Sequence, residues 1–532
     1  MNKKSKIKAV ITVVIVLCLS LCGVAIAVTV NDGLYNTDTP MLIAYNTPIK
    51  GVIESFEDYE SYMFEVKETG VVTIDLEHTA NSSGLEGGFV TTLYKIEKGE
   101  QTAFYEIASF EAFWTDVFTS SGTIGLAKGT YCVVVTVNSE LVSGNFTLTT
   151  YYTQTSAYES ELNDTKKTAD TIKVNTPKYG VISQRTEGVD YDWYKITLKE
   201  DKAVSLNFKH EDKSLPSVGW NIKLLTSDGK LLSEFTSKLS ETEIRTEFVG
   251  LRAGTYYIQV EGQGMAYEYN VTYTTASVDG WEIEFNDTDA TANNLSVNSQ
   301  ISGALSDRLL GLDKDYYKIN LSKNGYIDIT FTHPVYEGDK SGWNVRVLKK
   351  ESDGSYFEIV KKISLWNQSS LKITGLGLPA GEYFIVIDAD SASFNPGVYT
   401  CKWSFTAKSN YEKEPNNVIR RAQSINCNET YYGAIISSDS SANYDEDYYR
   451  FELTQETNVC LEFGHQKAAD SKVFWVASIV DEDGVDEFCK IESSFDSGLE
   501  STDVFKLSPG VYYVKIEGRY RSEAQYNFAV RR

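Results

Sequence analysis

Short runs in which apolar and polar residues alternate recur along most of this chain. Residues 194–198 read Tyr-Lys-Ile-Thr-Leu, and residues 256–260 read Tyr-Tyr-Ile-Gln-Val. Strict alternation over four to eight residues is typical of a β-strand with one buried face. Turn signals such as Asp228-Gly229 separate the runs, and no long segment has the 3.6-residue period of a helix. The pattern predicts an all-β protein, with only a short helix after each Asn-Asp pair, as at residues 165–169.

The runs are organised in four copies of one unit. Copies two to four open with a Glu-x-Glu-x-Asn motif, continue with a Gly-apolar turn and an Asp-x-Asp-aromatic-Tyr block, and close with Gly-x-Tyr before another alternating run. The first copy keeps the turn at Gly51 and a degenerate block at Asp58 and Glu60, but lacks the opening motif. The closing glycines are about 125 residues apart, which is the size of a whole domain rather than of a solenoid repeat.

Each copy is expected to be one β-sandwich domain. Many short alternating strands with turns between them favour two packed sheets. The predicted architecture is four tandem β-sandwich domains, here called modules one to four, behind an N-terminal segment. Their predicted bounds are residues 38–153, 157–276, 281–407 and 411–532, with residues 1–30 as a signal peptide or membrane anchor.

The N-terminus has the pattern of an export signal. Four lysines lie within the first eight residues, an apolar stretch runs from Ala9 to about Val30, and Ala25 and Ala27 form a small-x-small cleavage pattern. The stretch is also long enough to span a bilayer, so an uncleaved anchor is the alternative. In both cases the modules are expected to be extracellular or on the cell surface.

The net charge of the chain limits the kinds of partner that it can bind. The sequence has 50 Lys and Arg against 74 Asp and Glu, a formal net charge of −24. Nucleic acid and anionic lipid both require a basic face. We therefore expect no nucleic-acid partner, and contact with a membrane only through the N-terminal segment if it is uncleaved.

Two aromatic patterns recur with the repeats. Each module has one histidine at the end of an alternating run, 18 residues after the acidic block, which favours a structural role over zinc binding. Trp220, Trp343 and Trp475 recur in mid-module; core packing is favoured, and a stacking platform for a sugar or peptide is the alternative. The five cysteines beyond residue 30 do not recur, which favours free thiols, with a bridge inside module four as the alternative.

The opening motif and the acidic block together predict a calcium site. In an extended segment the side chains at i and i+2 point the same way, so both stretches present their oxygens on one face. Ca²⁺ takes six to eight oxygen ligands from such groups. The predicted ligands are Glu159, Glu161, Asn163, Asp164, Asp190 and Asp192 in module two; Glu282, Glu284, Asn286, Asp287, Asp313 and Asp315 in module three; and Glu412, Glu414, Asn416, Asn417, Asp445 and Asp447 in module four. Helix capping and solvated strand edges are the alternative interpretations.

The site is expected to differ among the modules. Module four has Asn417 where modules two and three have an acid, which predicts a weaker site. Module one keeps only Asp58 and Glu60, so we expect no site there. Clustered carboxylates repel one another, and a divalent cation relieves that repulsion.

The motifs resemble the bacterial pre-peptidase C-terminal domain family, which includes the collagen-binding domains of clostridial collagenases. The resemblance rests on the opening motif, the Gly-apolar turn, the acidic block and the closing Leu-x-Ala-Gly-x-Tyr at residues 251–256 and 378–383. It covers nearly all of the chain after residue 40, as four tandem copies. It implies a jelly-roll-like sandwich with structural Ca²⁺ at the acidic positions. Such domains usually accompany a secreted peptidase.

A non-catalytic exported protein is the expected function. The sequence contains no HExxH, GxSxG or Gly-rich phosphate loop, which disfavours an enzyme with an unrecognised site. We expect calcium-stabilised modules that bind extracellular polysaccharide or matrix protein. One alternative is a structural spacer or stalk without a ligand of its own, and another is an accessory protein of a secreted peptidase.

Overall fold

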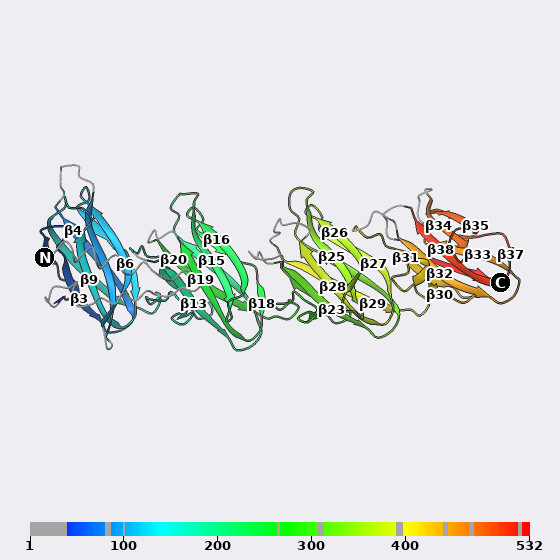
Figure 1. The fold of residues 1–532 in the computed structure, drawn as a ribbon, viewed down its shortest axis with the longest axis horizontal. Helices are drawn as coiled ribbons and strands as arrows, with labels where there is room; N and C mark the ends of the chain where they lie inside the picture. The colour runs from blue at the N-terminus through cyan, green and yellow to red at the C-terminus, as the bar shows by residue number, and fades with distance from the viewer. Residues whose placement is uncertain are drawn as a thin grey trace, which may run out of the picture.

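The computed structural model is built almost wholly of β-strands, which form four sandwiches in a row with the two labelled chain ends at opposite ends of the row (Figure 1). The residues that the structure describes are 40–79, 87–98, 102–186, 188–262, 267–305, 313–389, 397–439, 445–467, 473–519 and 524–532. The predicted signal or anchor segment lies outside these residues. Within them, no helix is long and apolar enough to cross a membrane.

The described residues of each module form nine or ten strands. Module one has β1 (Met41–Leu42), β2 (Ile49–Ile53), β3 (Glu60–Val66), β4 (Gly70–His78), β5 (Gly88–Lys98), β6 (Thr102–Phe113), β7 (Phe118–Ser120), β8 (Ile124–Leu126), β9 (Gly129–Val137) and β10 (Gly144–Gln154). Module two has β11 (Asp170–Thr171), β12 (Lys178–Val181), β13 (Tyr191–Leu198), β14 (Lys202–His210), β15 (Val218–Thr226), β16 (Leu231–Lys238), β17 (Glu243–Arg245), β18 (Val249–Leu251), β19 (Gly254–Gly262) and β20 (Glu268–Ala276).

Modules three and four repeat this order. Module three has β21 (Asn293–Asn294), β22 (Gln300–Gly303), β23 (Lys314–Leu321), β24 (Gly325–Thr332), β25 (Ser341–Lys350), β26 (Tyr356–Leu365), β27 (Ser370–Leu378), β28 (Gly381–Ala389) and β29 (Tyr399–Ala407). Module four has the short 3₁₀ helix η1 (Ile419–Arg421), β30 (Gln423–Ser424), β31 (Tyr431–Ile435), β32 (Glu446–Leu453), β33 (Thr457–His465), β34 (Val473–Val480), β35 (Glu487–Ser494), β36 (Leu499–Ser501), β37 (Phe505–Leu507), β38 (Gly510–Gly518) and β39 (Ala524–Arg531).

The two sheets of a module have the same topology in modules one, two and four, and module three differs in one strand. In module two one sheet has the order β11-β13-β19-β15-β16, and the other has β12-β20-β14-β17 with β18 also paired to β14. The first strand of each module pairs in parallel with the third, and the other pairs are antiparallel. In module three a single strand, β27, replaces the last two strands of the second sheet. The predicted all-β class with four sandwiches is confirmed.

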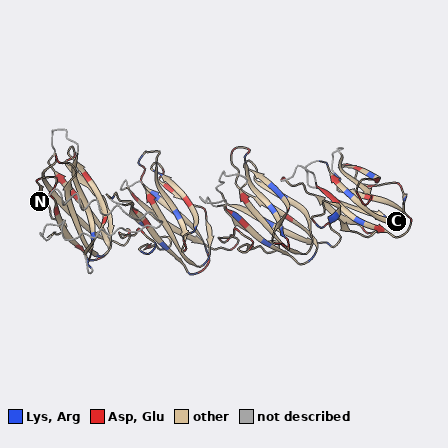
Figure 2. Cartoon of the chain, viewed as in Figure 1, with Lys and Arg blue, Asp and Glu red and all other residues tan. Residues whose placement is uncertain are grey.

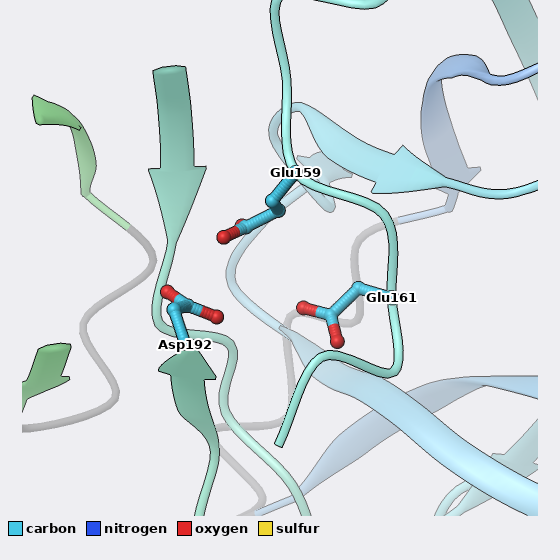
Figure 3. A group of neighbouring side chains, drawn as sticks. All are labelled: Glu159, Glu161 and Asp192. Carbon is cyan, nitrogen blue, oxygen red and sulfur yellow. The ribbon is translucent and has the colours of Figure 1, made fainter. Parts of the chain in front are cut away.

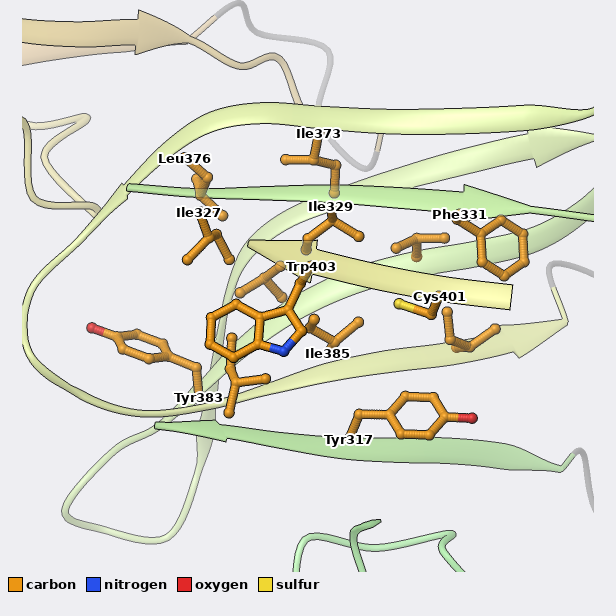
Figure 4. Packing of buried hydrophobic residues seen from close by; sticks show 14 of the residues in the cluster. Tyr317, Ile327, Ile329, Phe331, Ile373, Leu376, Tyr383, Ile385, Cys401 and Trp403 are labelled. Atoms are coloured by element: carbon orange, nitrogen blue, oxygen red, sulfur yellow. The ribbon is translucent and has the colours of Figure 1, made fainter. Parts of the chain in front are cut away.

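The core of each module lies between its two sheets. Along β24, Ile327, Ile329 and Phe331 are buried while the residues between them are partly exposed. Trp403 from β29 and Tyr317 from the facing sheet fill the space between the layers (Figure 4). The alternation in the sequence thus places one face of each strand against the opposite sheet, where its apolar surface is removed from water.

The recurrent histidines and tryptophans pack together inside the modules. The ring of His210 lies 4.3 Å from that of Trp220, and its Nε2 is 2.9 Å from the hydroxyl of the buried Ser237. The same trio occurs in modules three and four as His333, Trp343 and Ser364, and as His465, Trp475 and Ser493. The three tryptophans are buried, which confirms the core assignment and contradicts a stacking platform at these positions.

Two further details bear on the sequence analysis. The predicted helix at residues 165–169 is wrong, because the segment forms a single turn in which Thr168 N donates to Thr165 O over 3.0 Å. The two threonine hydroxyls, 2.9 Å apart, bond each other and the backbone there, and such bonds compete with a helix. The five cysteines of the described residues are free thiols, including those of module four.

Candidate metal centre

The Glu-x-Glu-x-Asn motif of each module forms an extended arm, residues 159–164, 282–287 and 412–417, which we call the acidic arm. It lies beside its own module because the first glutamate donates its backbone N–H to a neighbouring strand or turn. These bonds are Glu159 to Tyr179 O at 2.9 Å, Glu282 to Ser302 O at 2.9 Å and Glu412 to Tyr432 O at 2.8 Å. The asparagine carbonyl accepts from the strand that begins at the acidic block, as in Trp193 N to Asn163 O at 3.1 Å. The arm and the acidic block are therefore adjacent.

Three carboxylates converge in each of modules two to four. In module two, Glu159 and Glu161 of the arm face Asp192 at the start of β13, with one oxygen from each within 4.8 Å of the others (Figure 3). The corresponding groups are Glu282, Glu284 and Asp315 in module three, and Glu412, Glu414 and Asp447 in module four. The arms thus point toward the acidic blocks, as a shared ion requires.

Several oxygens in these clusters are buried without a hydrogen bond. In module two they are Glu161 Oε1, Asn163 Oδ1 and Asp192 Oδ1, which have no donor among the described residues. Asn286 Oδ1 and Asp315 Oδ1 are in the same situation in module three. A buried oxygen without a partner costs free energy. Carboxylate and amide oxygens facing one another, with no nitrogen or sulfur ligand, fit a hard cation such as Ca²⁺.

Two buried tyrosines hydrogen-bond to the cluster: Tyr194, which ends the acidic block, and Tyr269 of β20, which the sequence analysis did not single out. Tyr194 donates its hydroxyl to Glu159 Oε2 over 2.7 Å, and Tyr269 donates to Asp192 Oδ2 over 2.5 Å, while the two hydroxyls are 2.7 Å apart. A Cβ atom on Gly180 would lie 2.5 Å from the Tyr194 hydroxyl, which explains the glycine of the Gly-apolar turn. The equivalent tyrosine pairs are Tyr317 with Tyr399 and Tyr449 with Tyr526.

Arg185, also missed by the sequence analysis, divides the predicted ligand set of module two. Its guanidinium contacts Asp164 at 2.9 Å, Asp190 at 2.6 Å and Glu161 at 3.4 Å. Asp190 also accepts from Ser183 N over 2.5 Å. Asp164 and Asp190 therefore share the single positive charge of Arg185 at close range, and Glu161 is its more distant partner. Glu159, Glu161, Asn163 and Asp192 form the part that can hold a cation.

Module three has the same acids, and Glu284, Asp287 and Asp313 also lie within 4.8 Å of one another. Arg308 is five residues after Gly303, as Arg185 is five after Gly180, but it lies outside the described residues. Repeat alignment of this kind was the signal that could have revealed Arg185 from the sequence.

In module four an asparagine takes the place of the arginine as the partner of the first aspartate of the acidic block. Asn417 donates to Asp445 Oδ1 over 2.5 Å, and Ser438 stands where module two has Arg185. The amide oxygen of Asn416 faces oxygens of Glu414 and Asp447, and turning the amide over would make hydrogen bonds of 3.1 Å and 3.0 Å to them. This cluster can therefore be satisfied either by a cation or by the rotated amide.

Module one lacks the cluster in its described residues. Tyr62 is kept, but Phe146, paired with Gly51, stands where Tyr269 pairs with Gly180. Glu60 is partly exposed, unlike the buried Asp192. The second tyrosine is thus absent from the one module without an acidic arm, which ties its hydroxyl to the site rather than to packing.

Burial of the clusters raises their proton affinity. It raises the pKa of Glu159 to about 7, and that of Glu282 to about 7 with a further contribution from Asp313. Burial also raises the pKa of Glu161 well above its usual range; Asp190 adds to this and Arg185 opposes it. For Asp192, burial and the neighbouring Glu159 act in the same direction. Carboxylates of this kind take up protons unless a cation neutralises them.

Comparison with known proteins gives distant structural likenesses. No family model matches the chain, and no curated protein matches it. Among solved structures, the pre-peptidase C-terminal domain of collagenase from Bacillus anthracis is 17% identical, over 21% of this chain and 94% of that domain, with a TM-score of 0.17. N-glycanase F is 7% identical over 44% of this chain and 96% of that chain, with a TM-score of 0.19.

Tripeptidyl peptidase 2 is 7% identical over 63% of this chain and 32% of its own, with a TM-score of 0.16. The chain thus matches about a third of the length of that peptidase. These likenesses concern the fold of parts of the chain.

Proposed function

We propose that this is an exported, non-catalytic protein whose modules two to four are stabilised by Ca²⁺. The observation that carries the proposal is the set of buried oxygens without donors, Glu161 Oε1, Asn163 Oδ1 and Asp192 Oδ1, which lie in one cluster. Glu159, Glu161, Asn163 and Asp192, with their equivalents in the other two modules, would hold the ion. The ion supplies charge neutralisation and ties the acidic arm to the acidic block.

Calcium removal tests this proposal on the whole chain. At a calcium concentration 100 times Kd, binding to the folded state adds about 2.7 kcal/mol, or roughly 10 °C in Tm for a module of this size. Calorimetry with calcium and with chelator should show this shift for modules two and three, a smaller one for module four and the smallest for module one, which has no cluster of its own in its described residues. Asp192→Asn should abolish the calcium-induced shift of module two and leave those of modules three and four in place. A thermogram that chelator leaves unchanged would contradict the proposal.

The role of the array has two candidates. The family resemblance suggests adhesion to extracellular polysaccharide or matrix protein. It also suggests an accessory role beside a secreted peptidase. A spacer role is favoured by the arrangement of the modules end to end in a row (Figure 1). Lys and Arg stand among Asp and Glu on all four modules in the view of Figure 2, which suits a solvated rod.

A pull-down on insoluble glycans and on collagen separates these roles. A calcium-dependent adhesin is retained with calcium and released by chelator, and a spacer stays unbound in both conditions. The Asp192→Asn variant serves as the control, because it alters one site and leaves the outer surfaces of the modules unchanged.

A further inference from the structure

Each acidic arm lies against the preceding module as well as its own. The second glutamate of the arm donates its N–H to a glycine carbonyl of that module: Glu161 to Gly125 at 3.0 Å, Glu284 to Gly250 at 2.9 Å and Glu414 to Gly377 at 2.9 Å. Two of these contacts are parallel β-bridges, at Leu126 with Glu161 and at Leu251 with Glu284. Because the first glutamate bonds to its own module, the arm behaves as a strand shared by two modules.

Apolar residues beside the arm strengthen the same contact. Leu162 packs against the core of module one, and Phe285 packs against the core of module two. The ring of Trp281 is 6.0 Å from that of Phe248 in module two, and the ring of Tyr411 is 4.7 Å from that of Tyr326 in module three. The joints between modules are therefore packed interfaces rather than free linkers.

The glycine at each contact is required by the closeness of the arm. A Cβ atom on Gly125 would lie 2.1 Å from Glu159 O, and one on Gly250 would lie 1.8 Å from Glu282 O. On Gly377 it would lie 2.2 Å from Glu412 Cγ. No side chain fits at these distances, so the three glycines form the surface on which the arms dock.

Module four carries a lysine at the position of the docking glycine. Its β37 pairs with β33 through Lys506 and Asn458, as β18 pairs with β14 through Gly250 and Ala203. Lys506 thus replaces the glycine, and its side chain is 62% exposed and 3.0 Å from Glu456. The fold of a module therefore accepts a lysine at this position.

We propose that the glycine-bearing edge of each of the first three modules is a docking surface for the acidic arm of the next module, and that divalent-cation binding and docking are coupled. The second glutamate links the two events, because its backbone is held by the preceding module while its carboxylate faces the cation cluster. A group fixed by one partner loses less freedom on binding the other, so each event favours the other by the same factor. This inference rests on the proposed calcium site.

The test is Gly250→Lys in the full chain, which gives module two the residue that module four carries. Two readouts are needed: calcium affinity of module three by titration calorimetry, in a background of Asp192→Asn and Asp447→Asn, and hydrogen exchange of the Glu284 amide. The lysine should lower the affinity about tenfold and speed the exchange. Gly254→Ala is the matched control, since its Cβ would have no atom of another residue closer than 3.7 Å, and it should behave as the background protein.

The outcomes separate the coupling from the calcium site. Unchanged affinity in Gly250→Lys, with calcium binding intact in the background protein, overturns the coupling and leaves the proposed function standing. Unchanged exchange of the Glu284 amide also overturns it, because docking would not depend on the glycine. Absence of calcium binding in the unmodified chain overturns both. If Gly250→Lys does not fold, Gly250→Ala takes its place, because it adds only the Cβ atom. It should also lower the calcium affinity of module three and speed the exchange of the Glu284 amide.

Discussion

Two residues of module two, Arg185 and Asp164, change together in module four. Arg185 contacts Asp164, Asp190 and Glu161 with a side chain only 7% exposed. Module four has Ser438 and Asn417 at these two positions, and Asn417 donates to Asp445 in place of the guanidinium. Module four thus lacks both the positive charge of Arg185 and the negative charge of Asp164, so the balance of charge is kept.

Replacing Arg185 alone should destabilise module two. Arg185→Ser leaves the buried Asp190 and the partly buried Asp164 without their cation, and breaking a buried ion pair from one side costs about 3 kcal/mol or more. Urea unfolding in the presence of chelator, followed by tryptophan fluorescence, measures the loss. The double variant Arg185→Ser with Asp164→Asn copies module four and should recover most of it. A double variant no more stable than the single one would refute this account.

The second tyrosine should affect calcium more than stability. Tyr269→Phe removes the donor to Asp192 but keeps the ring, and module one carries Phe146 at this position. Loss of an outer-shell hydrogen bond typically weakens metal binding 10- to 100-fold, so calorimetric titration of module two should show a drop of about tenfold or more. Tyr256→Phe is the control, because its hydroxyl donates to Arg252 O away from the cluster. Equal affinities in both variants would show that the tyrosine is only structural.

At the residue scale, the sequence predicted which carboxylates lie together better than which residues bond to them. The i, i+2 spacing correctly placed Glu159 and Glu161 facing Asp192, because an extended arm leaves few alternatives for its side chains. Arg185 and Tyr269 were missed because each lies on a different segment from the motif and resembles many surface or core residues. Only alignment of the repeats, including the changes in modules one and four, separates them from their neighbours.

At the scale of elements, the strands could be predicted from the alternation of apolar and polar residues. The packed contacts between modules could not. β13 and β24 bury every second residue, as their sequences predict. The docking of the arm on β18 depends on which strand forms the edge of the sandwich, which local periodicity does not encode. The glycine of β18 is the one visible sign, and a lone glycine in a strand has several causes.

The buried carboxylates of the arm and the acidic block should make the metal-free protein less stable as the pH rises. Burial raises the pKa of Glu159 and Glu282 from 4.5 to about 7. The folded state then binds protons that the unfolded state has released, so the stability present below about pH 4.5 is lost as pH rises through 7. With chelator, Tm should fall between pH 5 and pH 8, by several degrees for modules two and three.

Calcium should reverse this profile, since protons compete with the ion for the same oxygens. The calcium-induced rise in Tm should be largest above pH 7 and nearly vanish at pH 5. Module one, which lacks the buried cluster in its described residues, serves as an internal reference with no such crossing. A metal-free Tm that climbs from pH 5 to pH 8 in modules two and three would contradict the role given to these carboxylates.

The whole molecule is a row in which each module contacts its neighbours through arms and edges (Figure 1). Additional contacts reinforce the first joint, where Ser109 N donates to Gln184 O over 2.7 Å and Arg185 Nε donates to Ile107 O over 3.0 Å. Arg185 therefore belongs both to the acidic cluster and to the interface with module one. In such an array stability spreads from neighbour to neighbour rather than through one common core.

Loss of the ion in one module should therefore loosen the module before it. Asp315→Asn removes a carboxylate from the cluster of module three, and the freed arm then protects the edge of module two less well. Hydrogen exchange in saturating calcium should speed up at β18, which receives this arm through Gly250, and stay unchanged at β8, which receives the arm of module two. Equal acceleration at both strands would mean general destabilisation, and no acceleration at β18 would mean that the joints are held without the ion.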